Sequence, residues 1–329
     1  MKSGLYTVEE VSVMIREGKK LLLAGDDKLL SQLPQGDWIG GTTPYFILRP
    51  EQMVESTEKL FVYSLPDFIE AVEVREYGSL DIKNIYSDAP QNGFTAIIIP
   101  FGSSVLSEFA LNVTGYKDFA RYPLCGWVSG QRLDVITTEK SYVSSGISNS
   151  LHSDKAVAMH IALPANKYAE IHMSNSFEQG SGDIITFEHK TLVVKEALVN
   201  GVKQNFATYL REAKVDTKMP LVANYSGAML NTNCFVIETD TVYLSSPVFE
   251  QVEYRFARQS AFVPEHEIAD ENVVMSASCV LNYVWPELCG KYIEIINAPA
   301  VYGQIAYQLI SQITMSVTIG DVPLNTETK

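Results

Sequence analysis

Two glycine-rich segments carry the side chains best suited to holding a small ligand. In the first, residues 37–46, paired glycines end an apolar run and hydroxyl side chains follow. Glycine lets the backbone turn and lets a ligand approach closely, while hydroxyl groups both donate and accept hydrogen bonds. The G-x-G-x-x-G spacing of a dinucleotide site is missing. We expect either a simple bend between strands or a binding lip formed by Gly40, Gly41, Thr42, Thr43 and Tyr45.

The second segment, residues 125–130, places Gly126 beside a cysteine and is expected to face the first segment across a cleft. A thiol at Cys125 invites a nucleophile interpretation, but no motif pairs it with an activating histidine. A buried, inert thiol is the favoured interpretation, because free cysteines are commonly buried. Catalysis through this residue therefore stays an alternative only.

No metal site or cofactor is expected. The chain has five histidines, and none stands in an H-x-x-x-H, H-E-x-x-H or H-x-H arrangement. His160 and His172 lie in strand-like runs, where a structural histidine with satisfied hydrogen bonds is the usual role. The four cysteines lack the paired spacing of zinc or redox motifs.

The charge excludes several classes of partner. The formal net charge is −14, with no basic cluster, so neither nucleic acid nor an anionic membrane surface is an expected partner. The first residues do not resemble a secretory signal, and no apolar run reaches membrane-spanning length. We expect a cytoplasmic protein.

Local patterns predict a strand-rich α+β fold. Thr7 and Glu10 form a capping box that opens a helix, and Asn200-Gly201 suits a hairpin turn. Residues 299–312 are predicted to form a final helix, because apolar residues recur at helical spacing. We expect two consecutive units, residues 1–204 and 205–329, and see no clean tandem repeat.

Residues 277–284 and 302–314 resemble the C-terminal half of FIST domains, which are two-part bacterial sensory modules. The glycine-rich segment that ends at Thr43 looks like the strand end of the N-terminal half. Where the family usually has Gly-Glu, this chain has Gly303-Gln304, so an amide replaces a carboxylate. The resemblance implies a FIST-like two-part architecture, with a FIST-N-like unit over 1–204 and a FIST-C-like unit over 205–329. It also implies a small, amino-acid-like ligand and a separate signalling partner.

We therefore expect a small-molecule-binding sensory protein without implied catalysis. Its pocket is expected between the two halves, where the candidates named above are joined by Asn282, Tyr302 and Gln304. One alternative is a cofactor-independent enzyme that uses Cys125 or Cys279 as nucleophile or Glu250 as base. A second alternative is an oligomeric interaction protein, to which the 17 tyrosines would also be suited.

Overall fold

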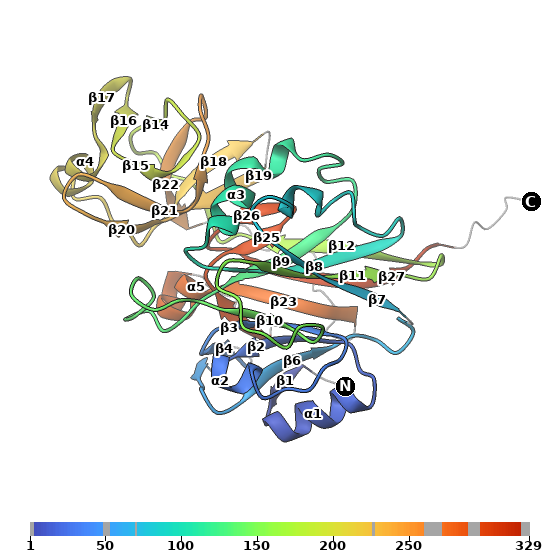
Figure 1. Ribbon diagram of the computed structural model, residues 1–329. Helices are drawn as coiled ribbons and strands as arrows, with labels where there is room; N and C mark the ends of the chain where they lie inside the picture. Colours follow the sequence, from blue (N-terminus) through green and yellow to red (C-terminus); the bar gives the residue numbers. More distant parts are fainter. Residues whose placement is uncertain are drawn as a thin grey trace, which may run out of the picture.

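The computed structural model describes most of the chain and has a strand-rich α+β fold, as the sequence predicts (Figure 1). The described residues are 3–48, 53–69, 71–225, 228–259, 272–288 and 297–323. Among them, three sheets share one strand order and one pattern of strand directions. We call the part built from these sheets the repeat body, and each sheet defines one repeat.

The first repeat has the strand order β1-β6-β2-β3. Its first three strands are antiparallel neighbours, and β2 and β3 run parallel with α2 between them in the chain. Its elements are β1 (Gly4–Tyr6), α1 (Val8–Arg16), β2 (Leu21–Gly25), α2 (Asp27–Leu30), β3 (Trp38–Thr42) and β6 (Leu60–Ser64).

The second repeat has the order β7-β11-β8-β9, with the same directions and with α3 between the two parallel strands. Its elements are β7 (Val72–Tyr77), η1 (Ile82–Asn84), β8 (Gly93–Pro100), α3 (Ser104–Asn112), η2 (Val113–Gly115), β9 (Leu124–Ser129) and β11 (Ala156–Ala162).

The third repeat has the order β12-β27-β23-β24, again with one parallel pair, here connected through α5. Its elements are β12 (Lys167–Ser174), β23 (Val273–Cys279), α5 (Val280–Val284), η4 (Pro286–Leu288), β24 (Ala298–Val301) and β27 (Thr314–Asp321).

Each repeat lends one strand to a neighbour. The strand β4 (Tyr45–Ile47) leaves the first repeat and pairs with β24 of the third, and β5 (Met53–Glu55) extends that edge. In the same way β10 (Val143–Ser145) pairs with β3, and β25 (Gln304–Ala306) pairs with β9 and forms a hairpin with β26 (Gln308–Ile310). The exchange is cyclic, so the three sheets are tied into one body.

The inner faces of the three sheets share one hydrophobic core. Ile39, Ile98 and Met275 come from different sheets and belong to the same cluster of buried side chains. Burying one such side chain contributes about 1.5–3 kcal/mol relative to exposure. The first sheet packs its other face on α1 and α2, while α3 and α5 belong to a second cluster with the outer faces of the other sheets.

A separate unit is inserted into the third repeat between β12 and β23, and it projects from one end of the body in Figure 1. It has its own core around Phe187 and Phe206. The expected boundary between residues 204 and 205 falls inside this inserted unit. Its elements are β13 (Phe177–Gln179), β14 (Ile185–Thr186), β15 (Thr191–Val194), β16 (Glu196–Val199), β17 (Val202–Asn205), α4 (Phe206–Glu212), β18 (Leu221–Tyr225), β19 (Ala228–Thr232), β20 (Cys234–Ile237), β21 (Val242–Val248) and β22 (Tyr254–Gln259).

Several local predictions are confirmed. Glu10 N donates to Thr7 Oγ1 at 3.3 Å, and Thr7 N donates to the Glu10 carboxylate at 2.8 Å, which completes the capping box. Asn200 and Gly201 both have positive φ and connect β16 to β17. The capping box and the hairpin turn therefore form where the residue types favour them.

The predicted helix over residues 299–312 is wrong, because this stretch forms β24, β25 and β26. Its apolar residues recur every four positions, but Val301, Ile305 and Leu309 lie on three different strands, so this recurrence does not mark one face of a helix. Tyr307, with φ of 61°, turns the chain between the two hairpin strands. Pairing of β25 with β9, far away in the sequence, decides the outcome.

Candidate functional site

The two predicted glycine-rich segments meet where β3, β9 and β24 end, a place we call the repeat junction. Gly130 N donates to Thr42 O at 2.7 Å, which joins the first two repeats. Thr43 Oγ1 donates to Ala300 O at 2.7 Å, which joins the first and third. The hydroxyl of Thr43 is thus already used in holding the repeats together.

Gly126 and Gln304 meet at the same junction through the pairing of β9 with β25. Gly126 lies opposite Ile305, and Gln304 lies opposite Trp127. Gly126 has a φ of 154°, and a Cβ at this position would overlap the carbonyl oxygen of Ile97. Glycine at 126 is therefore required for the close approach of two strands rather than for access of a ligand.

The predicted tyrosines Tyr45 and Tyr302 anchor the loop that follows β9. Leu133 N donates to the Tyr45 hydroxyl at 3.0 Å, and the Tyr302 hydroxyl donates to Gln131 O. The Tyr302 ring also lies 5.7 Å from that of Phe101, between ring centroids. Both tyrosines are buried, so they act as tethers for this loop.

The remaining predicted residues lie on different faces. A Cβ at Gly41 would lie 2.5 Å from Ile98 Cγ2 and 3.6 Å from Trp127 Nε1, so Gly41 belongs to the junction. A Cβ at Gly40 would instead meet Leu30 on the opposite face of the sheet. Asn282 donates to Ser278 Oγ at 3.2 Å within the third repeat.

The described thiols do not offer a nucleophile. Cys125, Cys234 and Cys279 are buried. Burial raises the pKa of Cys125, raises that of Cys234 to about 12 and raises that of Cys279 to about 11. Thiolate is the reactive form, so these environments suppress it. Cys289 lies outside the described residues.

Glu250, the candidate base, is exposed and forms an isolated bridge with Phe187 in the inserted unit. The two strand histidines have structural partners, as predicted. His160 contacts the Tyr77 hydroxyl and Thr95 Oγ1, both at 2.8 Å, and His172 contacts Thr318 Oγ1 at 2.8 Å. Burial, assisted by the charge of Arg75, lowers the pKa of His160 to about 4.

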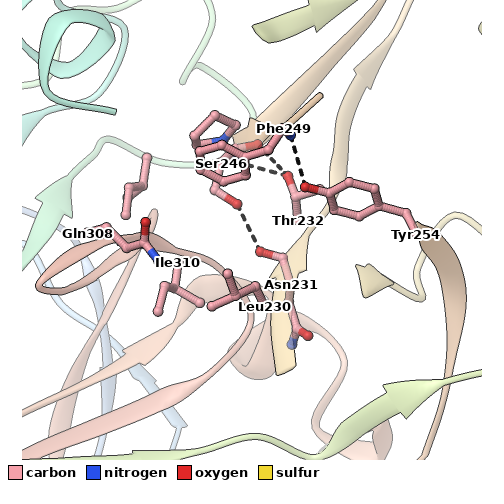
Figure 2. A pocket seen from close by; sticks show the side chains of 10 residues that line it. Leu230, Asn231, Thr232, Ser246, Phe249, Tyr254, Gln308 and Ile310 are labelled. Carbon is pink, nitrogen blue, oxygen red and sulfur yellow. Dashed lines mark hydrogen bonds between the residues drawn. The ribbon is translucent and has the colours of Figure 1, made fainter. Parts of the chain in front are cut away.

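A small recess that is open to solvent lies where the inserted unit meets the β25–β26 hairpin. Strands β19 and β21 and the start of β22 form one side, and the second hairpin strand forms the other (Figure 2). The lining residues are Leu230, Asn231, Thr232, Ser246, Pro247, Phe249, Tyr254, Gln308, Leu309 and Ile310. None of these side chains carries a charge, so the recess suits an uncharged guest.

Hydrogen bonds within the lining fix the walls of the recess. Thr232 Oγ1 donates to Ser246 O at 2.6 Å, and Ser246 Oγ donates to Asn231 O at 2.8 Å. Phe249 N donates to the Tyr254 hydroxyl at 3.0 Å. Gln308 lies across the recess from Ser246 and Thr232 in Figure 2 and is half-buried. The walls are therefore preformed, and Gln308 is more exposed than the other polar side chains of the lining.

Behind the recess, an uncharged network ties the hairpin to the inserted unit. Ser245 Oγ donates to Ser311 Oγ at 2.8 Å, and Ser311 Oγ donates to Asn231 O at 3.1 Å. Asn233 Nδ2 donates to Gln312 Oε1 at 2.5 Å. The segment that leads from the repeat junction to the recess is thus held at both ends.

Sequence reasoning missed the recess and also a charged cluster around Glu76. Glu76 lies 3.1 Å from Lys155 Nζ and 3.2 Å from His152 Nε2, and it accepts a hydrogen bond from Ser145 Oγ at 2.9 Å. Burial opposes ionisation of Glu76, but hydrogen bonds from Ser148, Ser145 and Lys155 together lower its pKa to about 2. No spacing motif could reveal this cluster, because the edges of two sheets assemble it.

The described ranges contain no group of three or more metal-binding side chains of the histidine, cysteine, aspartate or glutamate type. No helix within them has both the length and the apolar character needed to cross a membrane.

Comparison with known proteins identifies a family rather than an activity. No curated protein matches the chain. A family model described as "Family of unknown function (DUF6976)" matches residues 6–320, which include the three repeats almost entirely and the whole inserted unit. The chain therefore belongs to the DUF6976 family.

Proposed function

We propose that this protein binds a small, uncharged molecule in the recess between the inserted unit and the β25–β26 hairpin. The observation that carries the proposal is the convergence of two separate parts of the chain on one recess lined entirely by uncharged residues. Sites between structural units are common places for small ligands. The preformed hydrogen bonds among Thr232, Ser246 and Asn231 reduce the reorganisation that binding would require.

The lining also favours one kind of ligand. Leu230, Phe249 and Ile310 offer apolar contact, while Gln308 offers an amide that can donate and accept. A free amino acid would bring two charges against walls without a counter-charge, and burying an unpaired charge is costly. A neutral molecule with an apolar part and a hydroxyl or carboxamide group fits this chemistry better than the amino-acid-like ligand expected from the resemblance.

The sensory part of the proposal has separate support. The segment that resembles FIST domains, residues 302–314, contains the hairpin that forms one wall of the recess. A ligand in contact with this hairpin would act on the connection between the inserted unit and the repeat body. Signalling to a partner protein and the FIST-like two-part architecture remain proposals that depend on this resemblance.

The test is a thermal-shift screen with neutral alcohols, amides and nucleosides, paired with amino acids and keto acids. A ligand at 100 times its dissociation constant stabilises a fold by about 2.7 kcal/mol, which gives a measurable rise in Tm. We expect hits among the neutral compounds and at least tenfold weaker binding in Gln308→Leu. Gln204→Leu is the control, because Gln204 is also half-buried but lies on β17, outside the recess lining. Equal binding by both variants, or an absence of hits, would contradict the proposal.

A further inference from the structure

The repeat junction contains two polar side chains that are sealed from solvent. Gln304 is 0% exposed and Trp127 is 1% exposed. Among the described residues, the Gln304 Nε2 and Oε1 atoms and the Trp127 indole Nε1 have no hydrogen-bond partner. The interior of the junction thus holds two donors, Trp127 Nε1 and Gln304 Nε2, and one acceptor, Gln304 Oε1, that make no hydrogen bond there.

The two residues are neighbours in the sheet. Gln304 and Trp127 are directly opposite each other in the antiparallel pair of β25 and β9, and opposite residues project from the same face of a sheet. Trp127 belongs to the core shared by the three sheets, so both side chains point into the body. A rotation toward solvent is therefore closed to them.

Gly41 packs closely beside the indole. A Cβ at Gly41 would lie 3.6 Å from Trp127 Nε1 and would press on Ile98 Cγ2 at 2.5 Å. Any larger residue would place apolar atoms next to the indole N–H. The first repeat supplies this glycine, the second supplies Trp127 and the third supplies Gln304, so the site is shared by all three.

Leaving such groups unbonded is unfavourable. Each buried donor or acceptor without a partner costs roughly 1–3 kcal/mol, and native proteins commonly satisfy such groups with an internal molecule. An apolar side chain of the same length at position 304 would avoid the part of this cost that the amide adds. The presence of an amide at position 304 is explained if the amide has a partner.

We propose that Gln304 and Trp127 bind one small neutral molecule at the repeat junction, which accepts from Trp127 Nε1 and Gln304 Nε2 and donates to Gln304 Oε1. Water is the smallest molecule with this capacity, and a small alcohol or amide shares the chemistry. This site is separate from the recess and does not depend on the ligand proposed there.

The first test is NMR of the Trp127 indole N–H in the full-length protein, assigned with Trp127→Phe. Trp38 provides an internal reference, because its Nε1 donates to Pro34 O at 2.8 Å. We expect the Trp127 resonance to lie downfield with that of Trp38, and an upfield, non-bonded resonance would overturn the proposal. A cross-peak to water identifies water as the occupant. A co-purifying mass that is lost in Gln304→Met identifies an organic occupant.

The second test is the stability of Gln304→Met. Removing the amide from an occupied site strands the bound molecule and the indole N–H, so we expect at least a tenfold fall in the folding equilibrium constant. Gln204→Met, on β17 outside the recess and half-buried, should change it less than threefold. An increase in the folding constant of Gln304→Met would show that the amide had no partner and would overturn the proposal.

Discussion

The repeat body and the inserted unit bury uncharged polar side chains in different ways. At the repeat junction, glycines bring strands into close contact, and Gln304 is enclosed without a partner in the described part of the chain. At the edge of the inserted unit, the Thr232 hydroxyl donates to Ser246 O and accepts from Ser246 N, beside an open recess. The comparison indicates a tightly closed centre that tolerates little change and a periphery that tolerates more of it.

The largest expected effect is on the free energy of unfolding, when a glycine of the repeat body and a glycine of the inserted unit are each replaced by alanine. Gly126→Ala places a Cβ against the carbonyl oxygen of Ile97, so we expect a loss of about 4 kcal/mol or more in the free energy of unfolding. In Gly201→Ala, nothing lies within 4 Å of the new Cβ, and only the positive φ of 82° is unfavourable, at a cost of about 1 kcal/mol. Chemical denaturation of both variants measures the difference. Similar losses in the two variants would contradict a closed centre and an adaptable periphery.

A second difference is the response of the repeat body to acid. The folded pKa of His160 is about 4, below the ordinary value of 6.5, so the unfolded chain binds a proton first as the pH falls. The contribution of His160 to the free energy of unfolding is complete above about pH 6.5 and is lost as the pH falls toward 4. Between pH 7 and pH 5, it should lower the free energy of unfolding by roughly 2 kcal/mol.

Gln at position 160 does not titrate, so urea denaturation of His160→Gln should show a shallower fall between pH 7 and pH 5 than the wild type. The variant also loses stability at pH 7, because the contacts with Tyr77 and Thr95 change. An identical pH dependence in both proteins would mean that the burial of His160 does not affect acid stability.

A smaller effect is expected at the charged cluster that joins the edges of the first two sheets. Glu76→Gln removes the charge that faces Lys155 and His152, and we expect a loss of about 1–2 kcal/mol at pH 7. Because the folded pKa of Glu76 is about 2, below its ordinary 4.5, this contribution is complete above pH 4.5 and is lost as the pH falls toward 2.

Glu73→Gln is the control on the same strand. Glu73 pairs with Arg75 at 2.7 Å, but its side chain is 58% exposed, so its loss should cost less than about 0.5 kcal/mol. Equal effects of the two substitutions at pH 7 would show that burial of the Glu76 cluster adds nothing to its stabilising contribution.

Local sequence signals predicted local structure well. The Thr7 capping box and the Asn200-Gly201 turn depend on neighbours in the chain, and both are confirmed. A similar local bond caps α3, where the Ser103 hydroxyl accepts from Leu106 N at 3.1 Å. Such features need no knowledge of the rest of the fold.

The arrangement of the three repeats was beyond sequence reasoning, because the exchanged strands β4, β10 and β25 pair with partners far away in the chain. A spacing of four between Val301, Ile305 and Leu309 fits a helix, but these residues lie on three separate strands, and local spacing could not indicate the pairing of β25 with β9. For the candidate site, the glycine and hydroxyl pattern did locate residues that meet at the repeat junction. It could not indicate the recess, whose lining joins residues 230–254 to residues 308–310.

The most direct test of the central claim is mapping of a neutral screening hit by backbone amide NMR. If the hit binds in the recess, the largest chemical-shift changes fall on residues 230–232, 246–254 and 308–310. Gln308→Leu then weakens binding at least tenfold. Shift changes concentrated elsewhere, for example on α1 and α2 at the far side of the repeat body, would contradict the proposed binding site.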